Sequence, residues 1–299
     1  MSTVTVTTFT DPACPFAYSA EPIRWRLRWR YGDQLEWRLR LVGLSRDGAS
    51  YAQRGFTPEQ AAASLRNFDR YGQPLTEATS RPVGGTWEAC RAIVAVREHA
   101  GLDRAVHLLG ALHALALGDA RELSAADTIA EAVAEVGITI ADLDAWRADP
   151  AVETAFAADL TAARRPSPAA LALDQKLAPA GDEWDPDPAD VDPSLPPASG
   201  RRYTCPSYVL SDGERVLEAP GFHTALTIET LVANLAPRLE QRPWAEDPLE
   251  VLRWAGQPLT TQEVAAVLDR DDERDDVAAL LRELGATAHP LGNDARWTI

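Results

Sequence analysis

The sequence predicts an α/β fold, because segments with the repeat of a strand and segments with the repeat of a helix alternate along the chain. Residues 3–10 are rich in β-branched side chains, with valine and threonine alternating at the start, which is typical of a strand. Asp11-Pro12 follows and marks the end of this strand. Residues 15–31 place apolar and aromatic side chains at helical spacing, and apolar residues alternate again over residues 35–44. We therefore expect the chain to open as strand, helix, strand.

The middle of the chain is predicted to be a separate helical domain. Residues 57–177 are largely alanine-rich stretches with a helical pattern, separated by glycines. The clearest of these helices span residues 87–100, 105–117 and 124–136. Ser124 is an expected N-cap for the last of them. Residues 178–200 then hold six prolines and six acidic residues with no basic one, so we expect a long acidic, proline-rich loop.

Sheet and helix return after this loop. Residues 203–210 and 215–218 have strand patterns and flank a Ser-Asp-Gly-Glu turn at residues 211–214, which predicts a hairpin. A helix is predicted over residues 223–241.

Residues 243–299 resemble a winged helix-turn-helix module, since three predicted helices precede a strand, turn and strand. From residue 247 onward, acidic residues outnumber arginines by eleven to five, and the predicted recognition helix opens with the acidic run Asp271 to Asp276. This charge would repel phosphate groups, so a nucleic-acid partner is not expected. We expect the module to pack against the rest of the chain or to join two copies of it as a homodimer.

Composition restricts the function further. The 299 residues exceed what one hydrophobic core usually holds, and the net charge of −16 argues against a general binder of nucleic acid or anionic membranes. No long apolar run and no signal-peptide pattern is present, so we expect a cytoplasmic protein without a membrane partner. Three widely spaced cysteines do not suggest a disulfide scaffold, and any thiol chemistry is expected from individual side chains.

One cysteine occupies a position suited to chemistry. Cys14 lies between the first predicted strand and the first predicted helix, where unpaired backbone amides and the helix dipole favour a thiolate over a thiol. Pro15 suits the first helical turn, because its missing N–H would have no intrahelical acceptor. Cys14 is therefore the predicted nucleophile. Phe16 and Tyr18 are expected to line a groove beside it, although either one could instead anchor the helix to the sheet.

The motif D-P-A-C-P-F-A-Y, with its surrounding strand, helix, helical insertion and later hairpin, resembles the DsbA-like branch of the thioredoxin fold. This branch includes cytoplasmic actinobacterial thiol oxidoreductases, 2-hydroxychromene-2-carboxylate isomerases and kappa-class glutathione transferases. The resemblance covers residues 1–242 and implies a thioredoxin-like domain formed by residues 1–56 and 201–242. It also implies a cis proline at Pro206 that faces Cys14.

The same resemblance implies which residues bind the substrate. The backbone of Thr204 and Cys205, before the cis proline, would pair with an extended substrate. The predicted substrate-binding residues are Pro12, Pro15, Phe16, Tyr18, Thr204, Cys205 and Pro206.

The motif departs from this family's dithiol pattern at Ala17, which occupies the position of the resolving cysteine in Cys-x-x-Cys. Three interpretations remain. A small thiol such as mycothiol or glutathione could release Cys14 from a covalent adduct, or Cys14 could handle the sulfur of a bound thiol, as the corresponding serine does in the isomerases and transferases. Alternatively, Cys205 could pair with Cys14 as a redox disulfide or as a two-thiolate site for a soft metal such as Cu(I) or Hg(II). Cys205 could equally be a small apolar filler.

The sequence thus predicts a DsbA-like monothiol enzyme that uses Cys14 and a low-molecular-weight thiol on a small electrophilic or disulfide substrate, as an oxidoreductase, isomerase or transferase. The alternative is a non-catalytic binder of a soft metal or ligand through Cys14 and Cys205. No nucleotide-binding, zinc-protease or serine-hydrolase motif is present. No further metal ligands are predicted, because the histidines lack ligand spacing and Cys90 lies on an apolar helix face.

Overall fold

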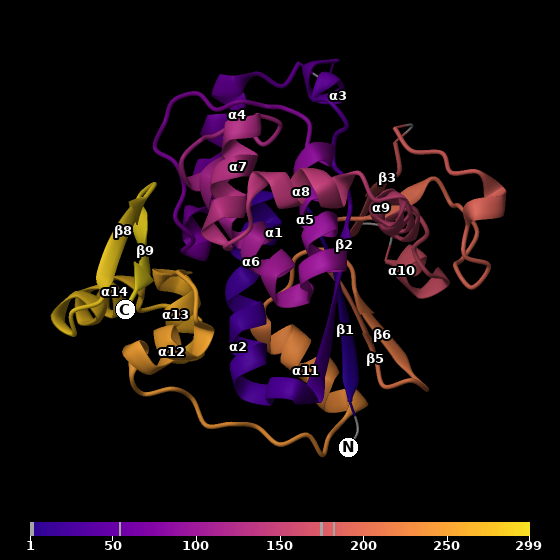
Figure 1. The fold of residues 1–299 in the computed structure, drawn as a ribbon. Helices are drawn as coiled ribbons and strands as arrows, with labels where there is room; N and C mark the ends of the chain where they lie inside the picture. The colour runs from indigo at the N-terminus through magenta and orange to yellow at the C-terminus, as the bar shows by residue number, and fades with distance from the viewer. Residues whose placement is uncertain (1–2, 54, 174–175, 182) are drawn as a thin grey trace.

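The computed structural model describes residues 3–53, 55–173, 176–181 and 183–299 (Figure 1). An N-terminal α/β domain is assembled from both sides of a helical insertion. Its elements are β1 (Val4–Thr10), α1 (Pro15–Ser19), α2 (Glu21–Tyr31), η1 (Gly32–Gln34), β2 (Leu35–Leu41), β5 (Ser207–Ser211), β6 (Val216–Ala219) and α11 (Ala225–Leu235).

The sheet of this domain has the strand order β2-β1-β5-β6. β1 runs parallel to β2 and antiparallel to β5, which forms the predicted hairpin with β6. Helices α2 and α11 cover one face, where Val6, Leu27 and Ile228 belong to one buried cluster. The valines of β1, Val4 and Val6, therefore lie on the buried face of the strand, as the alternating pattern predicts.

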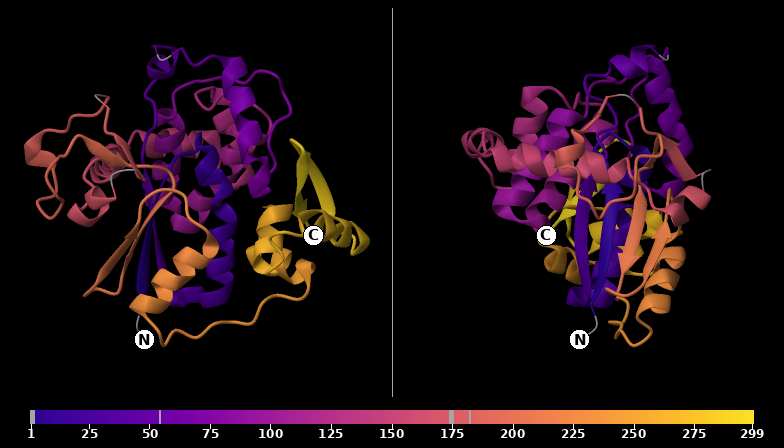
Figure 2. Two further views of the ribbon diagram at one scale, coloured as in Figure 1. Left: turned by 180° about the vertical axis from the view of Figure 1, so that it is seen from behind. Right: turned by 90° about the vertical axis from the view of Figure 1, so that its right-hand side faces the viewer.

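The helical insertion has its own large core, centred on α5 and α6. Its elements are α3 (Ala49–Gln53), α4 (Pro58–Leu65), η2 (Arg66–Tyr71), α5 (Trp87–Ala100), α6 (Leu102–His113), η3 (Ala114–Gly118), α7 (Ala126–Glu135), α8 (Ile140–Arg147), α9 (Pro150–Ala163) and α10 (Pro168–Ala172). Figure 2 shows this block above the sheet, at the end where β1 leads into α1.

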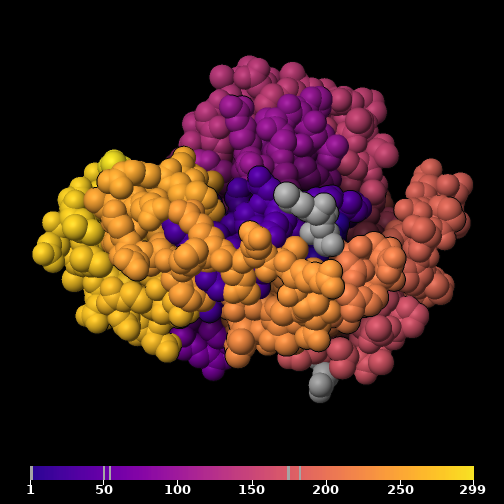
Figure 3. Space-filling model, turned by 90° about the horizontal axis from the view of Figure 1, so that it is seen from below, coloured from indigo at the N-terminus to yellow at the C-terminus, as the bar shows by residue number. Residues whose placement is uncertain are grey.

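The C-terminal module contains α12 (Pro248–Ala255), β7 (Leu259–Thr260), α13 (Thr261–Val267), α14 (Arg274–Glu283), β8 (Thr287–Leu291) and β9 (Asp294–Thr298). Along the chain, these elements follow the predicted order of helices and strands. In space, the three strands form a sheet of order β7-β9-β8. Trp25 and Trp29 of α2 belong to the core of the module, and Arg26 forms ion pairs with Asp269 and Asp271. The module therefore packs on α2. Seen from below, it lies at one side of the molecule (Figure 3).

Two predicted elements are each interrupted in the structure. The single helix expected over residues 15–31 is wrong, because α1 and α2 are separated at Ala20 and Pro22 lacks the N–H that a continuous helix would use. The single strand expected over residues 203–210 is also wrong. It is divided into β4 (Arg201–Tyr203) and β5, and the intervening loop contains Pro206.

Two further local predictions are corrected, one in the insertion and one in the segment that follows it. Ser124 does not cap α7, since its hydroxyl donates to Glu122 and Ala125 holds the cap position. The segment 178–200 is not entirely loop, because β3 (Leu177–Pro179) pairs with β4 and a short helical turn, η5 (Pro188–Asp190), follows. Among the described helices, none is both long and apolar enough to cross a membrane.

Candidate active site

Cys14 lies in the short turn that connects β1 to α1. Its backbone N–H donates to the Asp11 carbonyl at 3.1 Å, and its own carbonyl accepts the Tyr18 N–H at 3.0 Å. Cys14 is the N-cap residue of α1 and Pro15 begins the helix, as the motif predicts, although the Cys14 side chain makes no capping bond. The side chain is largely buried, with 7% of the residue exposed.

The Asp11 side chain forms hydrogen bonds within and around this turn. Its buried carboxylate accepts hydrogen bonds from the Ala13 N–H at 3.0 Å, from the Leu44 N–H at 2.8 Å and from the Thr86 hydroxyl at 2.9 Å. The Cys90 thiol lies 3.7 Å from the same carboxylate. Burial raises the pKa of Asp11, and these hydrogen bonds oppose the rise. Asp11 thus joins the Cys14 turn to the end of β2 and the start of α5.

His113 contacts the same turn from α6. Its Nε2 lies 3.1 Å from the Asp11 carbonyl oxygen, and because a carbonyl only accepts, this nitrogen carries the proton. Its Nδ1 has no hydrogen-bond partner among the described residues, and burial lowers the pKa of His113. The ring packs on Tyr18 with centroids 5.3 Å apart.

Cys205 lies on the other side of Cys14. The Cys205–Pro206 peptide bond is cis, as the resemblance implies, and the Cys14 thiol donates to the Cys205 carbonyl at 3.3 Å. Burial raises the pKa of the Cys205 thiol well above its usual range, and contact with the Cys14 thiol raises it further. All three cysteines are free thiols. The structure therefore brings Cys14 and Cys205 together without a disulfide bond between them.

The backbone expected to receive a substrate is already engaged in part. The Thr204 carbonyl accepts the Ser207 hydroxyl at 2.7 Å, and the Thr204 hydroxyl donates to the Lys176 carbonyl at 2.9 Å. The Cys205 carbonyl holds the Cys14 thiol. A second lone pair remains on each carbonyl, because a carbonyl oxygen accepts two hydrogen bonds.

A pocket of about 190 Å³ opens beside Cys14 on the side of the helical insertion. Its wall is mainly apolar and includes Pro15, Leu44, Tyr51, Phe56, Leu65, Val83 and Leu123. Two arginines also line it. Arg121 is paired with Asp127 and Glu131. Arg81 donates to the Ala116 carbonyl at 3.2 Å and forms no ion pair with any residue that the structure describes, and burial lowers its pKa.

Four rings form a second surface near Cys14, which we call the aromatic cluster: Phe16, Phe68, Tyr71 and Phe222. Phe16 meets Phe68 edge to face at 4.6 Å, and Tyr71 meets Phe222 at 4.6 Å. Phe16 and Phe222 are 5.8 Å apart. Phe16 is 39% exposed, so the cluster reaches the solvent at a residue two positions after Cys14.

The predicted substrate-binding residues do not all face this region. Tyr18 is only 1% exposed and belongs to the core of the helical insertion, so its predicted place in the groove is wrong and it anchors α1 instead. Pro12 and Pro206 are buried as well. Ala17, at the resolving position, is buried, with 2% of the residue exposed. Because its side chain is a methyl group, this position offers no second thiol and no polar replacement for one.

Three residues near the thiols were missed by sequence reasoning. His113 ends α6, Arg81 lies in the loop before α5 and Arg164 follows α9, so no local pattern connects them to Cys14. Arg164 donates to the carbonyls of Val42 and Gly43, and burial lowers its pKa to about 10. Only Asp11 had a signal in the sequence, because it begins the motif.

Comparison with known proteins identifies the family and the fold. The profile of the DSBA-like thioredoxin domain matches residues 5–166, more than half of the chain. The chain belongs to this family. No protein of curated function matches the sequence. The fold is similar to that of a "putative protein disulfide isomerase" from Nitrosomonas europaea, with a TM-score of 0.54 and 13% identity over 78% of this chain and 97% of that one. It is also similar to a "probable DsbA oxidoreductase" from Streptomyces coelicolor, with a TM-score of 0.51 and 19% identity over 82% and 94%.

Proposed function

We propose that this DSBA-like protein is a monothiol enzyme in which Cys14 is the nucleophile. A low-molecular-weight thiol such as mycothiol or glutathione is its co-substrate, and a small disulfide or electrophile is its substrate. The observation that carries the proposal is the placement of Cys14 at the start of α1, beside a pocket, with the buried Ala17 where a resolving cysteine would lie. Because no second thiol occurs in the motif, the release of Cys14 must come from outside it.

The reaction with a disulfide balances with two small thiols. The Cys14 thiolate attacks one sulfur of the substrate, forming a mixed disulfide and releasing the other half as a thiolate. A first small thiolate attacks the Cys14 sulfur, which releases the second half of the substrate and leaves Cys14 joined to the small thiol. A second small thiolate attacks the sulfur of that small thiol, which forms the small-thiol disulfide and frees Cys14. The substrate gains two electrons, and two small thiols lose them.

The pocket supports a substrate with a charged end and an apolar body. Arg81 offers a guanidinium without an acidic partner among the described residues, and a carboxylate is its natural complement. Tyr51, Phe56 and Leu65 offer an apolar wall on the same pocket. We infer that the substrate is a small molecule rather than a folded protein.

The experiment measures thiol-dependent reduction of bis(2-hydroxyethyl) disulfide, with glutathione and mycothiol in parallel. We expect turnover with at least one thiol and its loss in Cys14→Ser, while Cys205→Ser remains active. A Cys14→Ala protein with native turnover would contradict the proposal. Intact mass of protein purified without reductant gives an independent readout, because an adduct on Cys14 would identify the physiological thiol.

A second candidate rests on the contact between Cys14 and Cys205. Two adjacent thiols could bind Cu(I) or another soft metal in two-coordinate geometry. No group of three or more metal-binding side chains occurs among the described residues, so such a site would have only these two ligands. Competition for Cu(I) against bathocuproine disulfonate separates the candidates. A binder retains one equivalent and loses it in both Cys14→Ser and Cys205→Ser, whereas the monothiol enzyme retains none.

A further inference from the structure

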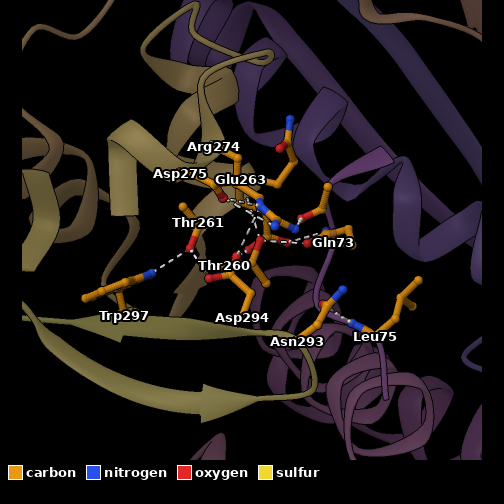
Figure 4. A network of polar contacts seen from close by, with 12 residues as sticks. Gln73, Leu75, Thr260, Thr261, Glu263, Arg274, Asp275, Asn293, Asp294 and Trp297 are labelled. Atoms are coloured by element: carbon orange, nitrogen blue, oxygen red, sulfur yellow. Dashed lines mark hydrogen bonds and ion pairs between the residues drawn. The ribbon is translucent and has the colours of Figure 1, made fainter. Parts of the chain in front are cut away.

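The segment Gly72–Thr76 runs between the helical insertion and the C-terminal module. On the side of the insertion, the Thr76 N–H donates to the Leu117 carbonyl at 2.7 Å. On the side of the module, the turn between β8 and β9 pairs with Leu75. The Asn293 N–H donates to the Leu75 carbonyl at 3.0 Å, and the Leu75 N–H donates to Asn293 Oδ1 at 3.0 Å (Figure 4). Both the N–H and the carbonyl of Leu75 are therefore hydrogen-bonded to Asn293.

Gly292 makes this close approach possible. It has a φ of +50°, and a Cβ at this position would lie 2.2 Å from the Leu75 carbonyl oxygen. Any other residue would push the turn away from the segment, because the atom that it meets is backbone and cannot rotate aside. The wing of the module is thus shaped to contact this chain itself.

Gln73 joins the same segment to the active-site helix. It is fully buried, and its Nε2 donates to the Tyr18 carbonyl of α1 at 3.1 Å. Its Oε1 accepts the Thr260 hydroxyl at 2.7 Å, and its Nε2 is 3.4 Å from Glu263. One side chain therefore bridges α1 and the start of α13. Figure 4 shows Gln73 beside Thr260 and Glu263.

The residues just before this segment carry half of the aromatic cluster. η2 ends at Tyr71, and both Phe68 and Tyr71 pack around Phe16, two residues after Cys14. At Gly72, whose φ is +80°, the Gln262 side chain fills the space that a Cβ would take. The rings of η2 are thus followed directly by residues that the module holds.

We propose that the C-terminal module is a positioning element for the aromatic cluster, with Gln73 and Asn293 as its positioning residues. By holding Gly72–Thr76, it sets Phe68 and Tyr71 against Phe16 and so favours aromatic groups at the approach to Cys14. The family profile ends at residue 166, so this role belongs to a part of the chain outside the matched domain. The inference rests on the proposed function only in taking Cys14 as the reacting group.

The test compares alkylation of Cys14 by N-methylmaleimide and N-phenylmaleimide, which share a reactive group and differ in the ring. Rates are followed by intact mass on the full chain, and Cys14→Ser gives the contribution of the other two thiols. We expect Gln73→Ala and Asn293→Ala to lower the phenyl-to-methyl rate ratio by about threefold or more, the scale of a lost aromatic contact. Gly292→Ala should lower it further, since its Cβ would displace the wing.

Two matched variants separate positioning from general damage. Asn293→Asp keeps the oxygen that accepts the Leu75 N–H, so it should retain the native ratio. Glu283→Gln, on the exposed end of α14, should do the same. An unchanged ratio in both Gln73→Ala and Asn293→Ala, with cooperative melting retained, would overturn the proposal. An equal fall of both rates would overturn it too, because access to Cys14 would then have changed without regard to the ring.

These outcomes do not depend on turnover. If the protein shows no activity with small thiols, the proposed enzymatic function fails, but the rate ratio still reports whether the module sets the aromatic cluster. If turnover occurs and the ratio is unaffected, only the positioning role fails.

Discussion

Two carboxylates near α1, Asp11 and Glu263, are buried, and they differ in the hydrogen bonds that offset the cost of burying their charge. Asp11 accepts short hydrogen bonds from two backbone amides and from the Thr86 hydroxyl. Glu263 accepts one short bond, from the Thr260 N–H at 2.9 Å, and among the described residues its other oxygen has only the long contact from Gln73. Asp11 and its donors lie within the family domain, and the contact between Glu263 and Gln73 joins that domain to the C-terminal module.

The smaller number of hydrogen bonds to Glu263 affects the pKa of its carboxyl group. Burial raises its pKa to about 7, and a single short backbone hydrogen bond does not offset the cost of burying the charge. Burial also raises the pKa of Asp11, but the three short hydrogen bonds and the longer contact with the Cys90 thiol oppose the rise. Asp11 receives donors from its own turn, from the end of β2 and from the start of α5, whereas Glu263 receives one backbone amide from its own cap and a long contact across the interface. Glu263 is therefore a pH-sensitive group at the interface between the family domain and the module.

The largest expected effect is that of Asp11→Ala. The substitution leaves two buried amides and one hydroxyl without their acceptor, which should lower the free energy of unfolding by at least about 3 kcal/mol. Urea denaturation measures this loss. Asp11→Asn, which keeps one acceptor oxygen and the side-chain volume, should lose less. An alanine variant within about 1 kcal/mol of the native protein would show that the turn does not depend on Asp11.

The next effect is the pH dependence caused by Glu263. A carboxyl whose pKa is raised from 4.5 to about 7 binds its proton more tightly in the folded state. Its contribution to stability is therefore complete below pH 4.5 and is lost as the pH rises to about 7. A shift of this size corresponds to about 3 kcal/mol. The groups that face it are Glu21, Arg24, Arg296 and Tyr18.

The matched variant is Glu263→Gln, which can keep the capping bond to the Thr260 N–H but does not titrate. Urea denaturation at pH 5 and pH 8 should show a smaller decline in stability for the variant than for the native protein. Equal declines in both proteins would assign the pH dependence to other groups.

The smallest effect is expected from Thr260→Val. This change removes the N-cap of α13 and the hydroxyl that donates to Gln73, and should cost about 1 to 2 kcal/mol. Thr260→Ser retains both bonds and is the control. Thermal melting of the two variants at one pH compares them, and a valine variant as stable as the serine variant would remove Thr260 from the interface argument.

Several features near Cys14 were predictable because they depend on neighbours in the chain. β1, the turn at Asp11 and the start of α1 at Pro15 follow from strand pattern, a proline and a cap position. The cis bond before Pro206 came from resemblance, not from local pattern. The prediction for Tyr18 failed because the sequence does not show which side of a short helix meets the core. A homodimer through the module stays a prediction.

The sequence by itself determined the α/β class, the family motif with Cys14 and Ala17, and the order of elements in the C-terminal module. These depend on repeats and motifs that span only a few residues. Only the tertiary structure decided that His113 meets Asp11, that Arg81 lines the pocket and that Gln73 joins α1 to α13. Such contacts link residues far apart in the chain, and their polar side chains are satisfied by partners that no local pattern specifies.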